Sequence, residues 1–168
     1  MKRRLAYAIT FVSSFCLLVV EMIAGRMLAP HVGVSLYTWT SIIGVVLAGI
    51  SAGAYAGGLL ADRYPQTRTL GFLLLVSGII VLFVPAVLNF AVDQRINTAL
   101  MWRILIITTV IFGLPSFLMG MVSPVVIRLV LEAVQEAGGL VGRIYAISTL
   151  GSLCGTFLTG FFLVSMIG

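Results

Sequence analysis

Glu21 is the residue whose chemistry most restricts the function of this chain of 168 residues. It lies inside an apolar run from Leu5 to Ala29 that is long enough to cross a membrane, where a carboxylate costs at least about 2.5 kcal/mol on insertion scales. Such a residue needs a partner or a task. Arg26 is the nearest cation along the chain, but five positions on a helix separate the two side chains by about 140°. Two interpretations stay open: Glu21 binds a cation or proton, or it anchors a structural ion pair with Arg26 or a hydrogen bond.

Hydroxyl side chains recur at helical spacing in four of the apolar runs, including the one that holds Glu21. Their positions are Tyr7, Thr10 and Ser14; Tyr37, Thr40, Ser41, Ser51 and Tyr55; Thr109, Ser116 and Ser123; and Tyr145, Ser148, Thr149, Ser152, Thr156 and Thr159. Because polar side chains avoid lipid, we expect these four faces to converge on a common interior. The expected ligands of a cationic small molecule there are Glu21, Tyr37, Tyr55, Tyr145, Ser148 and Ser152. Dry packing between helices explains the same stripes, so a wet cavity and dry packing both stay open.

Glycines form a second pattern. Gly49, Gly53 and Gly57 repeat every fourth position, on a different side of the second run from its hydroxyl groups. Small residues at this spacing let two helices approach closely in a membrane. We therefore expect these three glycines, together with Gly151 and Gly155, to form helix-packing surfaces.

The composition restricts the class of protein. The chain is 61% hydrophobic and 9% charged, with a mean hydropathy of +1.20, whereas soluble domains carry about 25% charged residues. This excludes a water-soluble fold. The net charge of +5 does not indicate nucleic-acid binding, because the cations separate apolar runs and do not cluster. Cys16 and Cys154 both lie inside apolar runs, and no nucleophile–base pair or metal set stands out, so we expect no metal, no cofactor and no enzyme.

The fold expected is an all-α membrane protein with a single transmembrane domain over residues 1–168. Five runs are long enough to cross the hydrocarbon core. Their expected bounds are 5–29, 38–60, 70–92, 100–134 (including a cytoplasmic extension) and 141–166. The third run is apolar all round, so we expect that helix at the outside of the bundle, facing lipid.

The basic residues predict an orientation. With five crossings, one side of the membrane receives Lys2, Arg3, Arg4, Arg63, Arg68, Arg128 and Arg143. The other side receives Arg95, with Arg26 and Arg103 near its boundary. The positive-inside rule then places the N-terminus in the cytoplasm and the C-terminus outside the cell or in the periplasm.

The turn after the second run resembles a motif of major facilitator superfamily transporters. It reads Gly58-Leu-Leu-Ala-Asp62-Arg63-Tyr-Pro-Gln-Thr-Arg68, against the family pattern Gly-x-Leu-x-Asp-Arg-x-Gly-Arg-Arg. The resemblance implies a cytoplasmic latch made by Gly58, Asp62, Arg63 and Arg68, with Asp62 bonding to a neighbouring helix end. Pro65 replaces the family's glycine, and only Arg68 remains of its basic pair. An ordinary turn on the positive side is the alternative.

A second resemblance covers nearly the whole chain. Five blocks, at 21–30, 37–44, 57–63, 142–152 and 155–161, look like the membrane region of bacterial fused spermidine-synthase-like membrane proteins. It implies a truncated major facilitator half of five helices, without the enzyme domain, in a bacterial inner membrane. It also implies polyamine-related biology.

Two functions follow from these patterns. The first is a half-size, facilitator-like transport or binding subunit for a cationic small molecule such as a polyamine, completed by a homodimer or a second membrane subunit. The alternative is a non-transporting membrane subunit that anchors a partner, possibly a spermidine-synthase-like enzyme. The docking surface in that case comprises Arg128, Glu132, Glu136 and the Gly138-Gly139 turn.

Overall fold

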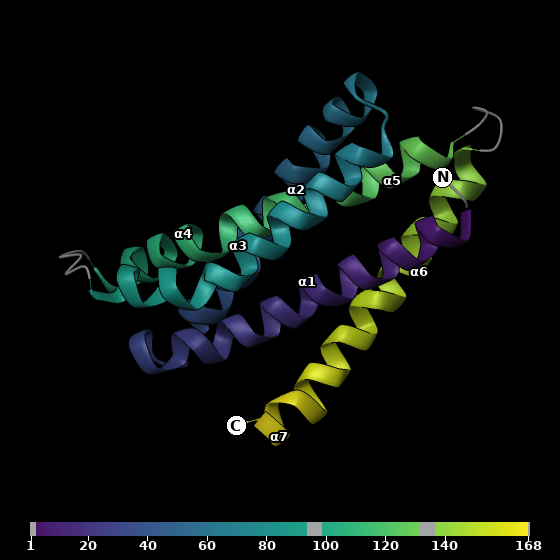
Figure 1. Cartoon of the computed structure of the whole chain (residues 1–168). Coiled ribbons are helices and arrows are strands. Elements are labelled where there is room, and N and C mark those ends of the chain that lie inside the picture. Colours follow the sequence, from purple (N-terminus) through teal and green to yellow (C-terminus); the bar gives the residue numbers. More distant parts are fainter. Residues whose placement is uncertain (1–2, 94–98, 132–136, 168) are drawn as a thin grey trace.

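The computed structural model of the chain describes residues 3–93, 99–131 and 137–167, and these ranges are helical apart from short connections (Figure 1). The elements are α1 (Arg3–Val32), α2 (Leu36–Arg63), α3 (Thr67–Asp93), α4 (Leu100–Gly120), α5 (Val122–Val130), α6 (Ala137–Leu158), the π-helical segment η2 (Thr159–Leu163) and α7 (Val164–Ile167). Five helical stretches are long and apolar enough to cross a membrane; α4 with α5 makes one, and α6 with its continuation makes another. The predicted all-α fold with five apolar helices is therefore confirmed over the described residues.

The helix ends differ from the predicted bounds. α2 begins earlier than expected because the Ser35 side chain accepts a hydrogen bond from the backbone N–H of Thr38 and caps the helix. The fourth run was expected to stay helical to residue 134. This prediction is wrong at Leu131, because α5 ends at Val130 and the backbone of Leu131 is extended, not helical. Residues 132–134 lie outside the described ranges. The predicted turn at residues 138–139 is also wrong, because both glycines lie in the first turn of α6.

The fourth span is interrupted once, at Met121, which ends α4 and precedes α5. Pro124 explains the position of the break. Its ring nitrogen carries no hydrogen and its ring crowds the carbonyl four residues earlier, which is that of Gly120. The two helices nevertheless continue in one direction (Figure 1).

Glycines create the two closest helix contacts. α2 packs along α4, and α1 packs along α6. A Cβ atom at Gly57 would lie 2.6 Å from the Cα of Met121, and one at Gly49 would lie 2.8 Å from the Cβ of Ser116. In α6, a Cβ atom at Gly155 would lie 2.6 Å from the carbonyl oxygen of Phe15 in α1. The remaining predicted packing glycines, Gly53 and Gly151, meet the backbones of Phe117 and Phe11 in the same way.

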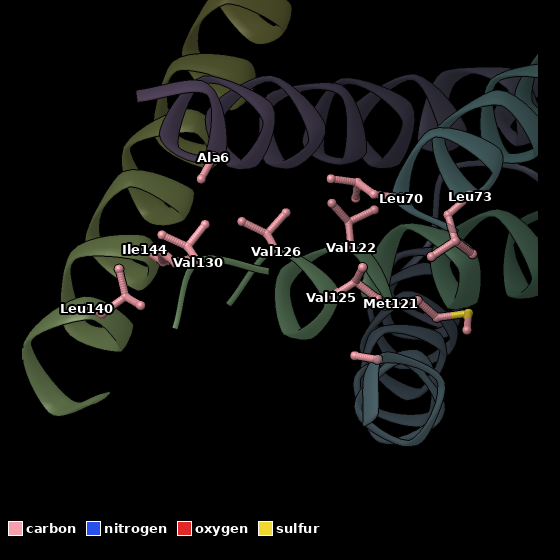
Figure 2. Close-up of a cluster of buried hydrophobic side chains, with 11 residues drawn as sticks. Ala6, Leu70, Leu73, Met121, Val122, Val125, Val126, Val130, Leu140 and Ile144 are labelled. Carbon is pink, nitrogen blue, oxygen red and sulfur yellow. The ribbon is translucent and has the colours of Figure 1, made fainter. Parts of the chain in front are cut away.

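Two apolar clusters lie at opposite ends of the bundle. Figure 2 shows the first, which joins the start of α1, the end of α2, the start of α3, the whole of α5 and the start of α6. The second joins the later part of α1, the start of α2, the end of α3 and the middle of α4. α6 contributes to the first cluster alone, through Leu140 and Ile144. α3 buries one face, against α4 above all, and exposes Phe72, Leu82 and Phe90 on the other, as expected for an outer helix.

Candidate functional site

A cavity of about 330 Å³ lies between α1, α2, the α4–α5 junction and α6. Six hydroxyl side chains line it, and we call it the hydroxyl cavity. They are Ser13, Ser14, Ser123, Tyr145, Ser148 and Ser152. The remaining wall is aliphatic and includes Leu17, Leu18 and Ile50. Such a surface offers hydrogen-bonding oxygens and apolar contacts to the same ligand.

α6 contributes three of the hydroxyl groups from one of its faces. Tyr145, Ser148 and Ser152 are spaced by three and four residues, which places them one above another on a helix. The close approach of α6 to α1 brings Ser148 Oγ within 2.6 Å of Ser14 Oγ, where the two hydroxyl groups form a hydrogen bond. This bond ties the two helices together at the wall of the cavity.

The break in the fourth span lies at the same wall. Gly120 and Pro124 both line the cavity. Since Pro124 has no N–H, it cannot donate the usual intrahelical hydrogen bond to the carbonyl of Gly120. The break therefore lies at the cavity wall, and the carbonyl of Gly120 lacks its usual intrahelical donor there.

Glu21 lies near the cavity but does not line it. It is partly exposed and follows Ser14 by seven residues, two helical turns or about 10 Å along the same face of α1. Leu17 and Leu18, which do line the cavity, lie between them. Within the described ranges, no hydrogen bond or ion pair reaches the Glu21 carboxylate.

Arg26 does not form the expected ion pair with Glu21 in the described part of the chain. Its guanidinium Nη1 instead donates a hydrogen bond to the carbonyl oxygen of Val164, at 2.9 Å. The angular separation of about 140° along α1 accounts for this, because it directs the two side chains to different neighbours. Arg26 thus ties α1 to the segment after η2.

Tyr37 and Tyr55 were expected in the cavity, and the structure places both elsewhere. Tyr55 is 75% exposed and lines none of the three described pockets, while Tyr37 is 57% exposed and lines a separate pocket with Met101 and Leu105. The reason is helical geometry. Gly53 and Gly57 face α4, and Tyr55 is two positions from each, about 200° around the helix.

The end of α2 forms an interhelical ion pair in the described part of the chain. Asp62 Oδ1 lies 3.3 Å from Arg128 Nε, in the last turn of α5, so Asp62 meets a neighbouring helix end as the motif suggested. The guanidinium of Arg63 lies over the ring of Tyr64, the next residue in the chain. Gly58 has open space at its Cβ position, and Arg68 is exposed. The carboxylate of Asp62 and the guanidinium of Arg128 are largely exposed. Ion pairs of this kind contribute about 0–1 kcal/mol to the stability of a protein.

The proposed docking surface is only partly described, since Glu132 and Glu136 lie outside the described residues. The structure also adds three cavity residues that were not among the expected ligands, Ser13, Ser14 and Ser123. Ser14 belongs to the hydroxyl stripe of the first run. Ser123 belongs to the seven-residue repeat of hydroxyl groups in the fourth run, so a signal for it was present. Ser13 carried no such signal, because it adjoins Ser14 without sharing a stripe.

No protein-family model, no curated protein and no solved structure matches this chain. The two family resemblances therefore stay predictions.

Proposed function

We propose that the chain is a membrane subunit that binds a cationic small molecule, such as a polyamine, in the hydroxyl cavity and contributes to its transport. The observation that carries the proposal is the cavity itself, with six hydroxyl groups beside an aliphatic wall. A polyamine alternates ammonium groups with methylene segments. The oxygens would accept hydrogen bonds from the ammonium groups, and Leu17, Leu18 and Ile50 would contact the methylene segments.

Glu21 would supply the counter-charge. A carboxylate within an apolar span is costly unless it pairs or binds a ligand, and in the described structure Glu21 has no such partner. It lies on the face of α1 that forms the cavity wall. An ammonium group moving along that face would leave the Ser14–Ser148 pair and reach the carboxylate two turns further on.

The setting we propose is a bacterial inner membrane, with the N-terminus in the cytoplasm and a facilitator-like arrangement of the helices. The basic residues of the described helix ends support this orientation, as Arg4, Arg63, Arg68, Arg128 and Arg143 lie toward the end that holds the first apolar cluster. Tyr145 is 60% exposed at the cavity wall, so the cavity is open on one side. A second copy or another membrane subunit would close it.

Uptake of a labelled polyamine into proteoliposomes tests the proposal. We expect Glu21→Gln to reduce uptake at least about tenfold, because one lost charge-assisted contact is worth about 1.5–3 kcal/mol. Glu21→Asp should restore part of the flux. Ser148→Ala should also lower uptake, whereas Ser165→Ala should not, since Ser165 lies outside the cavity and donates to the carbonyl of Phe161 in its own helix. Equal uptake by wild type and Glu21→Gln would remove the carboxylate from the mechanism.

One observation favours the alternative of a non-transporting subunit. The hydroxyl-bearing side of α2 faces outward, with Tyr37 and Tyr55 exposed, and polar side chains on an outer surface suit contact with a partner protein better than contact with lipid. This function predicts a stoichiometric complex after purification in a mild detergent, together with no polyamine flux. Native mass spectrometry of the purified protein distinguishes the two functions.

A further inference from the structure

A separate pocket lies between the first part of α2 and the first part of α4, and we call it the α2–α4 pocket. Its volume is about 380 Å³, and the residues that line it differ from those of the hydroxyl cavity. Its walls include four α2 residues at helical spacing and two α4 residues one turn apart: Tyr37, Thr40, Ser41 and Gly44, and Met101 and Leu105. The pocket therefore has a hydroxyl-bearing wall on one helix and an apolar wall on the other.

Ser41 is the most buried polar residue of this pocket. Only 9% of it is exposed, and within the described ranges its hydroxyl has no hydrogen-bond partner. Other buried hydroxyl groups of the bundle, such as those of Ser77 and Thr108, donate to the carbonyl oxygen four residues earlier in their own helix. A buried polar group without a partner is costly, and most such groups in proteins are hydrogen-bonded. Ser41 thus offers an unused donor and acceptor to a ligand of the pocket that it lines.

Two further hydroxyl groups belong to the rim of the pocket. Tyr37 is 57% exposed and Thr40 is also exposed, and neither hydroxyl has a hydrogen-bond partner among the described residues. Gly44 has open space where a Cβ atom would be added, so the pocket continues past Ser41 along α2. One ligand could therefore place a hydrogen-bonding group near the three hydroxyl groups and an apolar body over Gly44 and against Met101.

Charge restricts the class of ligand. The residues that line the pocket are all uncharged. Arg103 is two positions from both Met101 and Leu105, which places its side chain about 200° around α4 from each of them. A charged ligand would find no counter-charge in the pocket, and a charge within a membrane span is costly without one. The pocket therefore suits an uncharged ligand.

We propose that the α2–α4 pocket binds an uncharged, single-chain amphiphile that carries a hydroxyl group. Its hydroxyl would hydrogen-bond to Ser41, and its hydrocarbon would lie over Gly44. At about 30 Å³ for a group the size of a water molecule, the pocket holds roughly twelve such groups, which is too few for a diacyl lipid. A partner helix suits the pocket less well, because a helix resting on the rim would not reach Ser41, which is nine-tenths buried.

Photolabelling in vesicles tests this site directly. The probe is octanol with a diazirine at its third carbon, and the labelled peptides are identified by mass spectrometry. We expect this alcohol to label residues 37–44 and 101–105 saturably, and unlabelled octanol to prevent the labelling. Octane with the same diazirine should label these segments no more than it labels the exposed face of α3, at Phe72, Leu82 and Phe90. That face of α3 also serves as the internal standard for every variant.

Two variants test the proposed contacts. Ser41→Ala should raise the probe concentration for half-maximal labelling about fivefold, the usual value of one hydrogen bond. Thr109→Ala is the matched control, because the Thr109 hydroxyl is exposed and donates to the carbonyl of Leu105 in its own helix. Gly44→Leu should abolish the saturable labelling by filling the pocket, whereas Gly71→Leu, on α3 and also with open space at its Cβ position, should leave it intact.

Three results would overturn the proposal. The alcohol and the hydrocarbon could label the pocket segments equally, Ser41→Ala could leave the half-maximal concentration unchanged, or the diazirine at these segments could be excluded by a second protein chain that cross-links to Tyr37→Cys. None of these outcomes depends on polyamine flux. A protein that transports nothing can still bind the alcohol, and one that transports can lack this second site.

Discussion

The hydrogen bond between Ser14 and Ser148 joins hydroxyl side chains of two spans, α1 and α6. Several other hydroxyl groups there, such as those of Thr108 and Thr156, donate to carbonyl oxygens of their own helices. Those bonds satisfy a polar group without linking helices. The serine pair therefore has a distinct role, because it fixes the relative position of α1 and α6 beside the cavity.

We expect the serine pair to show a measurable but modest coupling energy. Hydrogen bonds between membrane helices average about 0.6 kcal/mol in double-mutant cycles, with a maximum near 1.7 kcal/mol. Ser14→Ala, Ser148→Ala and the double variant, unfolded by sodium dodecyl sulfate in mixed micelles, give the coupling directly. A cycle of Ser14→Ala with Ser165→Ala is the matched control. Additive effects of Ser14→Ala and Ser148→Ala would show that the bond contributes nothing to stability.

At the level of single residues, helical periodicity predicted part of the candidate site. Tyr145, Ser148 and Ser152 were selected together as one stripe, and all three line the cavity. Periodicity states which side chains share a face, but it does not state which face meets which neighbour. α2 has two distinctive faces, and the choice of partner for each depends on the shapes of the other helices, so Tyr37 and Tyr55 were misplaced.

Between elements, the contact of α2 with α4 and α5 gives the most direct test of packing. A Cβ atom at Gly53 would overlap the backbone of Phe117, which cannot move as the end of a flexible side chain would. We expect Gly53→Ala to destabilise the protein by about 1–3 kcal/mol, the usual range for overpacking. Unfolding by sodium dodecyl sulfate in mixed micelles again provides the measurement.

Gly44 supplies the control on the same helix. It is exposed and has open space where a Cβ atom would be added. Gly44→Ala should be neutral or stabilising by up to about 1 kcal/mol, because alanine loses less conformational freedom than glycine when a helix forms. If the two variants were equally stable, the close approach of α2 to the fourth span would not describe the protein in solution.

The five apolar helices could be predicted because hydropathy responds to the same property that membrane insertion requires. Their ends could be predicted less well, since they depend on local groups. Ser35 caps α2 three residues before its predicted start. α6 begins at Ala137 and continues through Gly138 and Gly139, although glycines favour turns in isolation. The break at Met121 follows from Pro124, but whether a helix continues beyond a proline depends on its neighbours.

For the whole molecule, the proposed orientation rests on the unequal distribution of charge between the two ends of the bundle. The connection after α1 contains no charged residue from Gly33 to Ser35, whereas the connection after α2 follows Arg63 directly and precedes Arg68. Basic residues resist translocation across a bacterial inner membrane, so the end with the arginines should stay in the cytoplasm. We therefore expect the two connections to lie on opposite sides of the membrane.

Cysteine accessibility tests this orientation in intact cells. In a chain with Cys16→Ser and Cys154→Ser, we expect a membrane-impermeant maleimide to label Val34→Cys from outside, because Val34 is 76% exposed in the first connection. Gln66→Cys, exposed in the second connection, should react only after the cells are opened. The reverse pattern would place the arginines outside.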